Sequence, residues 1–291
     1  MTTTRTLGIS CLQSQGVPGD IAHNLAEVDR AAAQAKADGA DLLITPEMFL
    51  TGYDCGPIEA VLSQGHDLQR SAADIAVRHQ IALLVGMPLR MPDRSVGISA
   101  VFLDDTGQTL GQYTKSHLSG WPVNDNDRFT AGSEPTALVD YRGVKIAILI
   151  CMDLEFPEPA RLAALAGADL IAVLTSNMEP YAGINEHLVW TRAWENQTYV
   201  AYVNRCGIEG TTHYVGLSSI YAPSGDLLAR ADGRPALLRA DIDPHEIVSA
   251  RDSFNYLAQR RPNLYSGLTS PSDTAGSSET TPDANGLRAA P

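Results

Sequence analysis

The apolar run Val144–Ile150 ends directly at Cys151, and the segment Met152–Glu158 that follows it is rich in carboxylates. A run of this length and composition is typical of a buried strand, and Pro157 favours the start of a helix just beyond it. The sequence therefore places a thiol at the exit of a buried strand, where backbone N–H groups can stabilise negative charge. A small buried hydrophobe is nevertheless the more common role of a lone cysteine.

Two further apolar runs lead to an ionisable residue. Asp41–Pro46 leads to Glu47, and Gly111–Thr114 leads to Lys115. An acid, an amine and a thiol, each at or near a strand end, are the parts of a covalent hydrolase. A helix start and a nearby cation are expected to lower the pKa of the Cys151 thiol and make it more nucleophilic. Taken singly, a strand-end carboxylate or lysine is more often a solvated residue.

Helical and strand patterns alternate along the chain, which indicates a mixed α/β fold. The spacing of apolar residues predicts helices over residues 20–37 and 68–79, and strands over residues 6–12 and 42–45. Asp20 is suited to be the N-cap of the first helix.

The second half of the chain partly repeats the first. Gly167–Val173 echoes Gly39–Ile44, each being Gly-Ala-Asp followed by an apolar run. Hairpin signals also occur in both halves, around Asp104–Gly107 and around Pro223–Asp226. Two similar halves predict two mixed sheets packed face to face with helices outside. Because Gly, Ala and Asp are common residues, the echo alone is equally compatible with chance.

Composition narrows the class of protein. At 291 residues and 44% hydrophobic content, the chain can bury a full core. No apolar stretch is long enough to span a bilayer, and residues 1–5 lack the apolar core of a secretion signal. The formal net charge of -13 argues against nucleic acid or an anionic membrane as a partner. The 4 cysteines include no CxxC pair, so neither zinc nor a disulfide framework is expected and a cytoplasmic location fits best.

The C-terminal segment differs from the rest of the chain. Residues 266–291 are rich in Ser, Thr, Gly, Pro, Asp and Ala, with few large apolar side chains. Such a segment cannot offset its ordering entropy by burial, so we expect a disordered tail. The expected folded domain therefore spans residues 1–265.

Three segments carry a specific resemblance to a known family. Leu43–Tyr53, Tyr113–Leu118 and Leu149–Glu158 resemble the three signature blocks of the nitrilase (carbon–nitrogen hydrolase) superfamily, in the right order. The resemblance covers residues 6–243 and implies an α/β fold, a four-layer α-β-β-α sandwich of two mixed sheets with outer helices. It also implies a dimer or higher homo-oligomer. The implied Glu-Lys-Cys triad cleaves non-peptide C–N bonds through a thioester, with no metal or organic cofactor.

The resemblance also implies a role for each matched residue. Cys151 is the nucleophile, and Glu47 is the general base that takes its proton and later activates water. Lys115 and the backbone N–H of Met152 would hold the oxyanion of the tetrahedral intermediate. His117 offers an alternative Cys–His dyad, although a lone histidine is more often structural.

The sequence departs from the family at a second glutamate, which many members carry after the catalytic lysine to position the substrate amide. Residues 121–129 contain no glutamate. Asp125 lies nearest the expected place, with Asp127 behind it, and either could supply the carboxylate.

Cys151-Met152-Asp153 resembles the amidase-type branches, because true nitrilases of the family usually have Cys-Trp-Glu there. We therefore expect a small aliphatic amide or ω-amide to be hydrolysed to carboxylate and ammonia. An N-carbamoyl amino acid or amine hydrolase and a nitrilase are the alternatives among enzymes. A catalytically silent binding protein on the same fold is the alternative of a different class. The expected pocket walls, for each of which a core or interface role is nearly as common, are Tyr53, Trp121 and Asn177.

Overall fold

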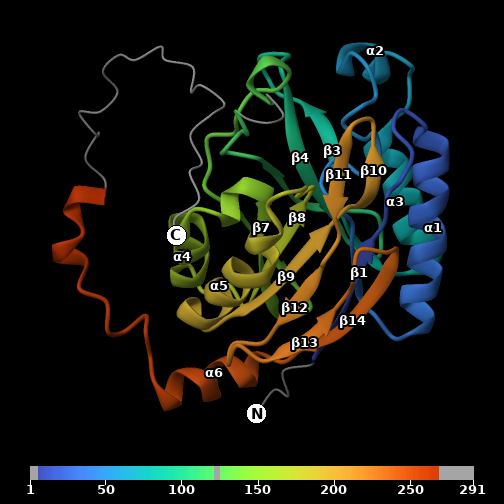
Figure 1. Cartoon of the computed structure of the whole chain (residues 1–291). Coiled ribbons are helices and arrows are strands. Elements are labelled where there is room, and N and C mark those ends of the chain that lie inside the picture. The colour runs from blue at the N-terminus through green and yellow to red at the C-terminus, as the bar shows by residue number, and fades with distance from the viewer. Residues whose placement is uncertain (1–5, 121–124, 269–291) are drawn as a thin grey trace, which may run out of the picture. The chain divides into compact units, whose positions relative to one another are not determined.

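Two six-stranded mixed sheets form the centre of the protein, as the computed structural model shows for residues 6–120 and 125–268 (Figure 1). In spatial order, the strands of the first sheet are β14 (Ala236–Ile242), β1 (Leu7–Gln13), β2 (Leu42–Ile44), β3 (Ala82–Arg90), β4 (Val96–Leu103) and β5 (Thr109–Thr114). Those of the second are β13 (Leu227–Arg230), β12 (Ser219–Tyr221), β9 (Tyr199–Asn204), β8 (Leu170–Thr175), β7 (Val144–Ile150) and β6 (Ala137–Tyr141). A separate ribbon consists of β10 (Cys206–Glu209) and β11 (Thr212–Val215).

Helices cover the outer face of each sheet. Helices α1 (Ile21–Ala37) and α3 (Leu68–His79) pack on the first sheet, and α4 (Pro157–Leu165) and α5 (Val189–Asn196) pack on the second. Figure 1 shows the two pairs on opposite sides of the sheets, which confirms the expected α-β-β-α arrangement. The Asp20 side chain caps α1 by accepting a hydrogen bond from the His23 N–H, as predicted. The remaining helices are α2 (Ile58–Leu62) and α6 (Pro244–Ser253).

Strand β7 shows why the central strands are apolar throughout. Successive side chains of a strand point to opposite faces of the sheet. Ile146, Ile148 and Ile150 belong to the apolar core shared with the first sheet. Ala147 and Leu149 belong to the second core, beneath α4 and α5. Both faces are therefore buried, and this requires the continuous apolar run that ends at Cys151.

The internal echo in the sequence corresponds to a structural repeat. Strands β1, β2 and β3 are parallel neighbours, and so are β7, β8 and β9, with antiparallel strands on both sides of each set. Asp41 and Asp169 precede the middle strand of their set and accept a backbone hydrogen bond from the outer parallel strand. The donors are the N–H groups of Gly8 (3.1 Å) and Lys145 (2.8 Å). The Gly-Ala-Asp sequence therefore has the same structural role in both halves of the chain.

The described chain divides into two compact units, with the boundary between Leu257 and Ala258. Of the expected tail, only Ser266–Leu268 lies within the described residues, as a 3₁₀ turn. Residues 269–291 lie outside them, so the expected disorder and the boundary at residue 265 stay predictions. In the part of the chain that the structure describes, no helix is long and apolar enough to cross a membrane.

Two glycines let the backbone approach closely at the ends of β2 and β5. A Cβ on Gly86, in β3, would lie 2.2 Å from the carbonyl oxygen of Pro46 and 2.8 Å from the nitrogen of Met48. A Cβ on Gly132 would lie 2.2 Å from the carbonyl oxygen of Thr114. Side chains cannot fit at such distances, so both positions require glycine. Backbone packing therefore fixes the segments that carry Glu47 and Lys115.

We expect Gly86→Ala to lower the free energy of unfolding by about 1–3 kcal/mol, because the added methyl overpacks the Pro46–Met48 backbone. Urea unfolding would measure the change. The matched control is Gly233→Ala, whose Cβ would meet only the Val215 carbonyl oxygen, at 3.6 Å. Equal stability of the two variants would contradict the packing argument.

Candidate active site

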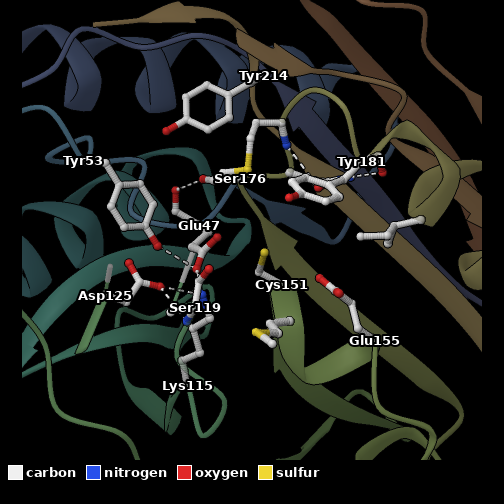
Figure 2. A pocket seen from close by; sticks show the side chains of 15 residues that line it. Glu47, Tyr53, Lys115, Ser119, Asp125, Cys151, Glu155, Ser176, Tyr181 and Tyr214 are labelled. Carbon is white, nitrogen blue, oxygen red and sulfur yellow. Dashed lines mark hydrogen bonds and ion pairs between the residues drawn. The ribbon is translucent and has the colours of Figure 1, made fainter. Parts of the chain in front are cut away.

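Glu47, Lys115 and Cys151, which the sequence places near three strand ends, line one cavity (Figure 2). Glu47 lies shortly after β2, Lys115 directly after β5 and Cys151 directly after β7. The first two residues therefore come from one sheet and the third from the other. The cavity has a volume of ≈ 330 Å³, which is at the lower end for small-molecule sites.

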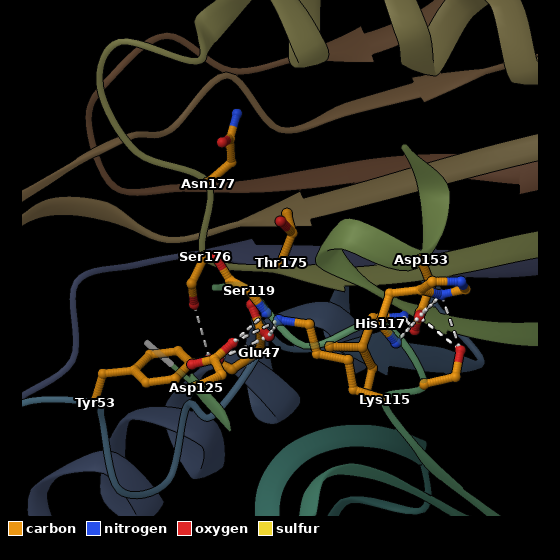
Figure 3. Close-up of polar contacts among 12 residues, drawn as sticks. Glu47, Tyr53, Lys115, His117, Ser119, Asp125, Asp153, Thr175, Ser176 and Asn177 are labelled. Atoms are coloured by element: carbon orange, nitrogen blue, oxygen red, sulfur yellow. Dashed lines mark hydrogen bonds and ion pairs between the residues drawn. The ribbon is translucent and has the colours of Figure 1, made fainter. Parts of the chain in front are cut away.

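A buried ion network joins the cation to two carboxylates (Figure 3). Lys115 Nζ lies 2.9 Å from Glu47 Oε1 and 3.2 Å from Asp125 Oδ2. The three side chains are only 1–3% exposed. Burial by itself acts to lower the pKa of Lys115, but the negative charges of Glu47 and Asp125 outweigh it and raise the pKa well above its usual value. Lys115 therefore stays an ammonium.

Each carboxylate of the network keeps one oxygen without a partner. Glu47 Oε1 also accepts a hydrogen bond from the Tyr53 hydroxyl (2.8 Å), and Asp125 Oδ2 accepts one from the Ser119 N–H (3.2 Å). Glu47 Oε2 and Asp125 Oδ1 are buried and have no hydrogen-bond partner among the described residues. Buried acceptors are nearly always paired in folded proteins, so these two oxygens are suited to a ligand that donates hydrogen bonds.

Cys151 lies at a strained turn of the backbone. Its φ is 49°, in the left-handed region that a residue with a Cβ occupies at a cost of about 1–3 kcal/mol. The turn begins the 3₁₀ helix η2 (Cys151–Leu154), whose second residue is Met152. The first N–H groups of a helical turn have no acceptor within it, so the Met152 N–H is available to an anion beside the thiol.

The expectation of a lowered pKa for the Cys151 thiol is wrong. Burial and the charge of Glu47 raise its pKa, and the opposing effects of the Lys115 ammonium and a hydrogen bond with Thr175 do not compensate. Lys115 is already shared by two carboxylates, so the network as a whole is negative beside the sulfur. The thiol is therefore protonated.

His117 lies outside the cavity and binds the buried carboxylate of Asp153. Its Nδ1 lies 2.8 Å from Asp153 Oδ1, and its ring stacks on Phe156. Asp153 also accepts hydrogen bonds from the Tyr113 hydroxyl (2.8 Å) and the Ile150 N–H (3.1 Å). Asp153 therefore joins the end of β5 to the end of β7, and His117 belongs to this structural junction.

The structure distinguishes the other expected site residues. Asp125 lines the cavity, whereas Asp127 is exposed and does not line it. Tyr53 lines the cavity and binds Glu47. Asn177 also lines it, but both hydrogens of its amide go to the protein, to the Tyr181 carbonyl (2.9 Å) and the Asn185 side chain (2.5 Å). Asn177 is therefore a scaffold of the wall, and the expected wall residue Trp121 lies outside the described residues.

Tyr53 is held in place by a buried ion pair. Glu209 Oε1 accepts hydrogen bonds from the N–H groups of Tyr53 and Asp54. Its other oxygen lies 2.8 Å from Arg205, and both side chains are at most 2% exposed. Burial is the main reason why the pKa of the Tyr53 phenol is well above its usual value, and the nearby charges of Glu47 and Asp125 raise it further. Tyr53 is therefore neutral and donates its hydroxyl hydrogen to Glu47.

Sequence reasoning missed most of the cavity wall. The sequence could have indicated Glu155 as a site residue, because a second carboxylate shortly after Cys151 is unusual in a turn between a buried strand and a helix. Tyr214 comes from β11, and Ser176, Met178 and Tyr181 come from the segment after β8, where no local pattern marks a site. The missed lining residues are Ser119, Gly120, Glu155, Ser176, Met178, Tyr181, Ile184 and Tyr214. Within the described residues, no group of three or more His, Cys, Asp or Glu could hold a metal ion.

Residues 8–252 match the family model described as carbon-nitrogen hydrolase. The chain belongs to the carbon–nitrogen hydrolase family. It is therefore a hydrolase that acts on C–N bonds, and its fold and signature blocks agree with the nitrilase superfamily.

Among curated relatives of this carbon–nitrogen hydrolase, a Pseudomonas protegens protein named "Hydrolase in pqqF 5′region" is 42% identical over 91% of this chain and 93% of its own. An (R)-stereoselective amidase from Pseudomonas sp. is 32% identical over 87% of this chain and 91% of its own. An amidase from Nesterenkonia sp. has a similar solved structure, with a TM-score of 0.81, 32% identity and coverage of 90% of this chain and 96% of its own. In a structure of a mutant of the amidase from Nesterenkonia sp. AN1, the acetamide moiety of fluoroacetamide is covalently added at the active-site cysteine.

We expect Asp153→Asn to lower the free energy of unfolding of this hydrolase by about 1–3 kcal/mol, because an amide cannot accept all the bonds of the buried carboxylate. His117→Ala removes a side chain that is 36% exposed, so its cost should stay below about 1 kcal/mol and hydrolysis should continue. Urea unfolding and product release would measure both effects. Loss of hydrolysis in folded His117→Ala would instead favour the Cys–His dyad.

Proposed function

We propose that the chain is an amidase that converts a small primary amide to a carboxylate and ammonia through a thioester on Cys151. The observation that carries this proposal is the pair of unpartnered acceptor oxygens, Glu47 Oε2 and Asp125 Oδ1, in the same cavity as the thiol. A primary amide carries an NH₂ group with two N–H donors. A nitrile nitrogen donates nothing, so it would leave both buried oxygens unpartnered.

In the first half of the proposed reaction, the sulfur of Cys151 attacks the carbonyl carbon while its proton moves to Glu47 Oε2. The electrons of the C=O bond move to the oxygen, which binds the Lys115 ammonium and the Met152 N–H. An ammonium has three N–H donors, and Lys115 uses two of them for Glu47 and Asp125. One donor is therefore left for the oxyanion.

Collapse of this intermediate breaks the C–N bond. The nitrogen takes the proton from Glu47 and leaves as ammonia, and the acyl group stays on sulfur as a thioester. In the second half, Glu47 takes a proton from water while the water oxygen attacks the thioester carbon. The C–S bond then breaks, the sulfur of Cys151 takes the proton back from Glu47, and the acid is released.

Relatives support the proposed reaction class. Similar proteins from Pseudomonas and Nesterenkonia are named amidases. A mutant of the Nesterenkonia amidase carries a covalent group on its active-site cysteine, which agrees with a nucleophilic thiol. The expected homo-oligomer and cytoplasmic location stay predictions. Large exposed apolar side chains on α4 and α5 would suit a subunit interface; they are Leu162, Leu165, Trp190 and Trp194.

We expect Cys151→Ala to abolish ammonia release from primary amides, because no other thiol lies in the cavity among the described residues. Cys55→Ala is the matched control and should keep the wild-type rate. Ammonia release would be measured for an aliphatic amide, its nitrile and an N-carbamoyl amine. Faster release from the nitrile or the carbamoyl compound, or activity in Cys151→Ala, would contradict the proposal.

Asp125→Asn should lower amide turnover by about a hundredfold, because misorientation of the substrate by small distances costs this much. Asp127→Asn removes the same charge from an exposed neighbour and should leave turnover near wild type. Steady-state ammonia release from both variants measures the difference. Similar rates for the two variants would show that the Asp125 carboxylate does not position the amide.

A further inference from the structure

Glu155 is a cavity-lining carboxylate that the proposed reaction does not use. Among residues 6–120 and 125–268, no side chain forms an ion pair or hydrogen bond with its carboxylate. Its backbone is nevertheless fixed, because its N–H donates to the Met152 carbonyl (3.0 Å) and its carbonyl accepts from Arg192 Nη2 (2.8 Å). Burial raises the pKa of the Glu155 carboxyl, so its charge is only partly hydrated.

The charge of the cavity is unbalanced. Its described lining contains three carboxylates, Glu47, Asp125 and Glu155, and one cation, Lys115. Lys115 is already bound by Glu47 and Asp125, so its charge compensates Glu155 only in part. A substrate that carries its own positive charge would correct this imbalance, and a substrate that carries a carboxylate would worsen it.

Glu155 lies at the end of the cavity opposite the place where the substrate amide would bind. The amide end must lie beside Glu47, Lys115 and Asp125, where the oxyanion donors and the free acceptors are. Figure 2 shows Glu155 on the other side of Cys151 from Lys115 and Asp125, with its carboxylate directed toward the cavity. An acyl chain attached to the sulfur and leading away from Lys115 would therefore extend toward Glu155.

The wall beside Glu155 also suits a cationic chain. Figure 2 shows Tyr181 on the same side of Cys151 as Glu155. Ile184 and Met152 also line the cavity, and the Met152 carbonyl accepts a hydrogen bond from the Glu155 N–H. Apolar side chains fit the methylene groups of a short acyl chain, and the face of a tyrosine ring attracts an ammonium group. A carboxylate at the end of such a wall fixes the position of the charge.

We propose that Glu155 selects primary amides whose acyl chain carries a protonated amine, and disfavours ω-amides whose far end is a carboxylate. This inference rests on the proposed amidase function. Glu155 is here a specificity residue and takes no part in bond breaking.

Three amides of equal chain length test the proposal: δ-aminovaleramide with an ammonium end, neutral hexanamide, and adipamate with a carboxylate end. Wild-type kcat/KM should be highest for δ-aminovaleramide and lowest for adipamate. An ion pair to a partly buried charge predicts a difference of about ten- to a hundredfold between the ammonium and the neutral amide. In Glu155→Gln this advantage should fall to about twofold or less, with hexanamide turnover retained. Glu158→Gln, an exposed carboxylate on α4, is the matched control and should keep the preference.

If wild-type kcat/KM is equal for the three amides, the inference is overturned by the wild-type measurement alone. An equal loss on all three amides in Glu155→Gln would also overturn it, because the residue would then act in catalysis or folding. Failure of the proposed function is distinguishable, because wild-type enzyme would then release ammonia from none of the three amides. That result would overturn both proposals.

Discussion

The contact of Lys115 with Glu47 and Asp125 is the interaction on which the rest of the site depends. Three charges are almost fully removed from water, and each desolvation is costly unless the partners stay together. Removal of Lys115 would leave two buried carboxylates uncompensated, and removal of either carboxylate would change the charge beside the thiol. The backbone supports the network at the same place, since Gly86 and Gly132 allow close packing at the segments that carry Glu47 and Lys115. The ion network and the backbone packing of the first sheet therefore hold Glu47 and Lys115 in the same relative position.

The burial and the excess negative charge of this network determine when a thiolate can form at Cys151. Burial makes a thiolate at Cys151 unfavourable in the free enzyme, and the charge of Glu47 adds to this effect. The Lys115 ammonium does not compensate, because two carboxylates share it. In the proposed mechanism, the nucleophile is therefore generated only when Glu47 takes the proton during attack on a bound amide. Lys115 would supply its remaining donor at the same stage, when negative charge develops on the substrate oxygen. Glu155 adds to this excess of negative charge, and the same excess would favour substrates that carry a positive charge.

Local sequence patterns predict the strand ends well and the orientation of side chains poorly. The apolar run of β7 indicates where Cys151 lies, because a strand buried on both faces must be apolar throughout. The pairing of β14 with β1, in which Leu7 lies opposite Ile242, joins distant parts of the chain and has no local signal. Asn177 lines the cavity, as expected for a pocket wall, but both hydrogens of its amide are bound within the protein. The sign of the Cys151 pKa shift also needed the fold, since its largest cause is burial and the next is the charge of Glu47, which is far from the thiol in sequence.

The most direct test of this account is the protonation state of Cys151 in the free enzyme. Thiolate absorbs in the ultraviolet, so the difference in absorbance between wild type and Cys151→Ser can be followed from about pH 6 to 9, a range that spans the ordinary pKa of a cysteine. Cys11, Cys55 and Cys206 are present in both proteins and cancel in the difference. The account predicts no thiolate signal throughout this range, because burial raises the pKa of Cys151 above the ordinary value. A thiolate signal already complete at neutral pH would contradict it, because Cys151 would then form a stable pair with Lys115 and Glu47 would not be needed to remove its proton.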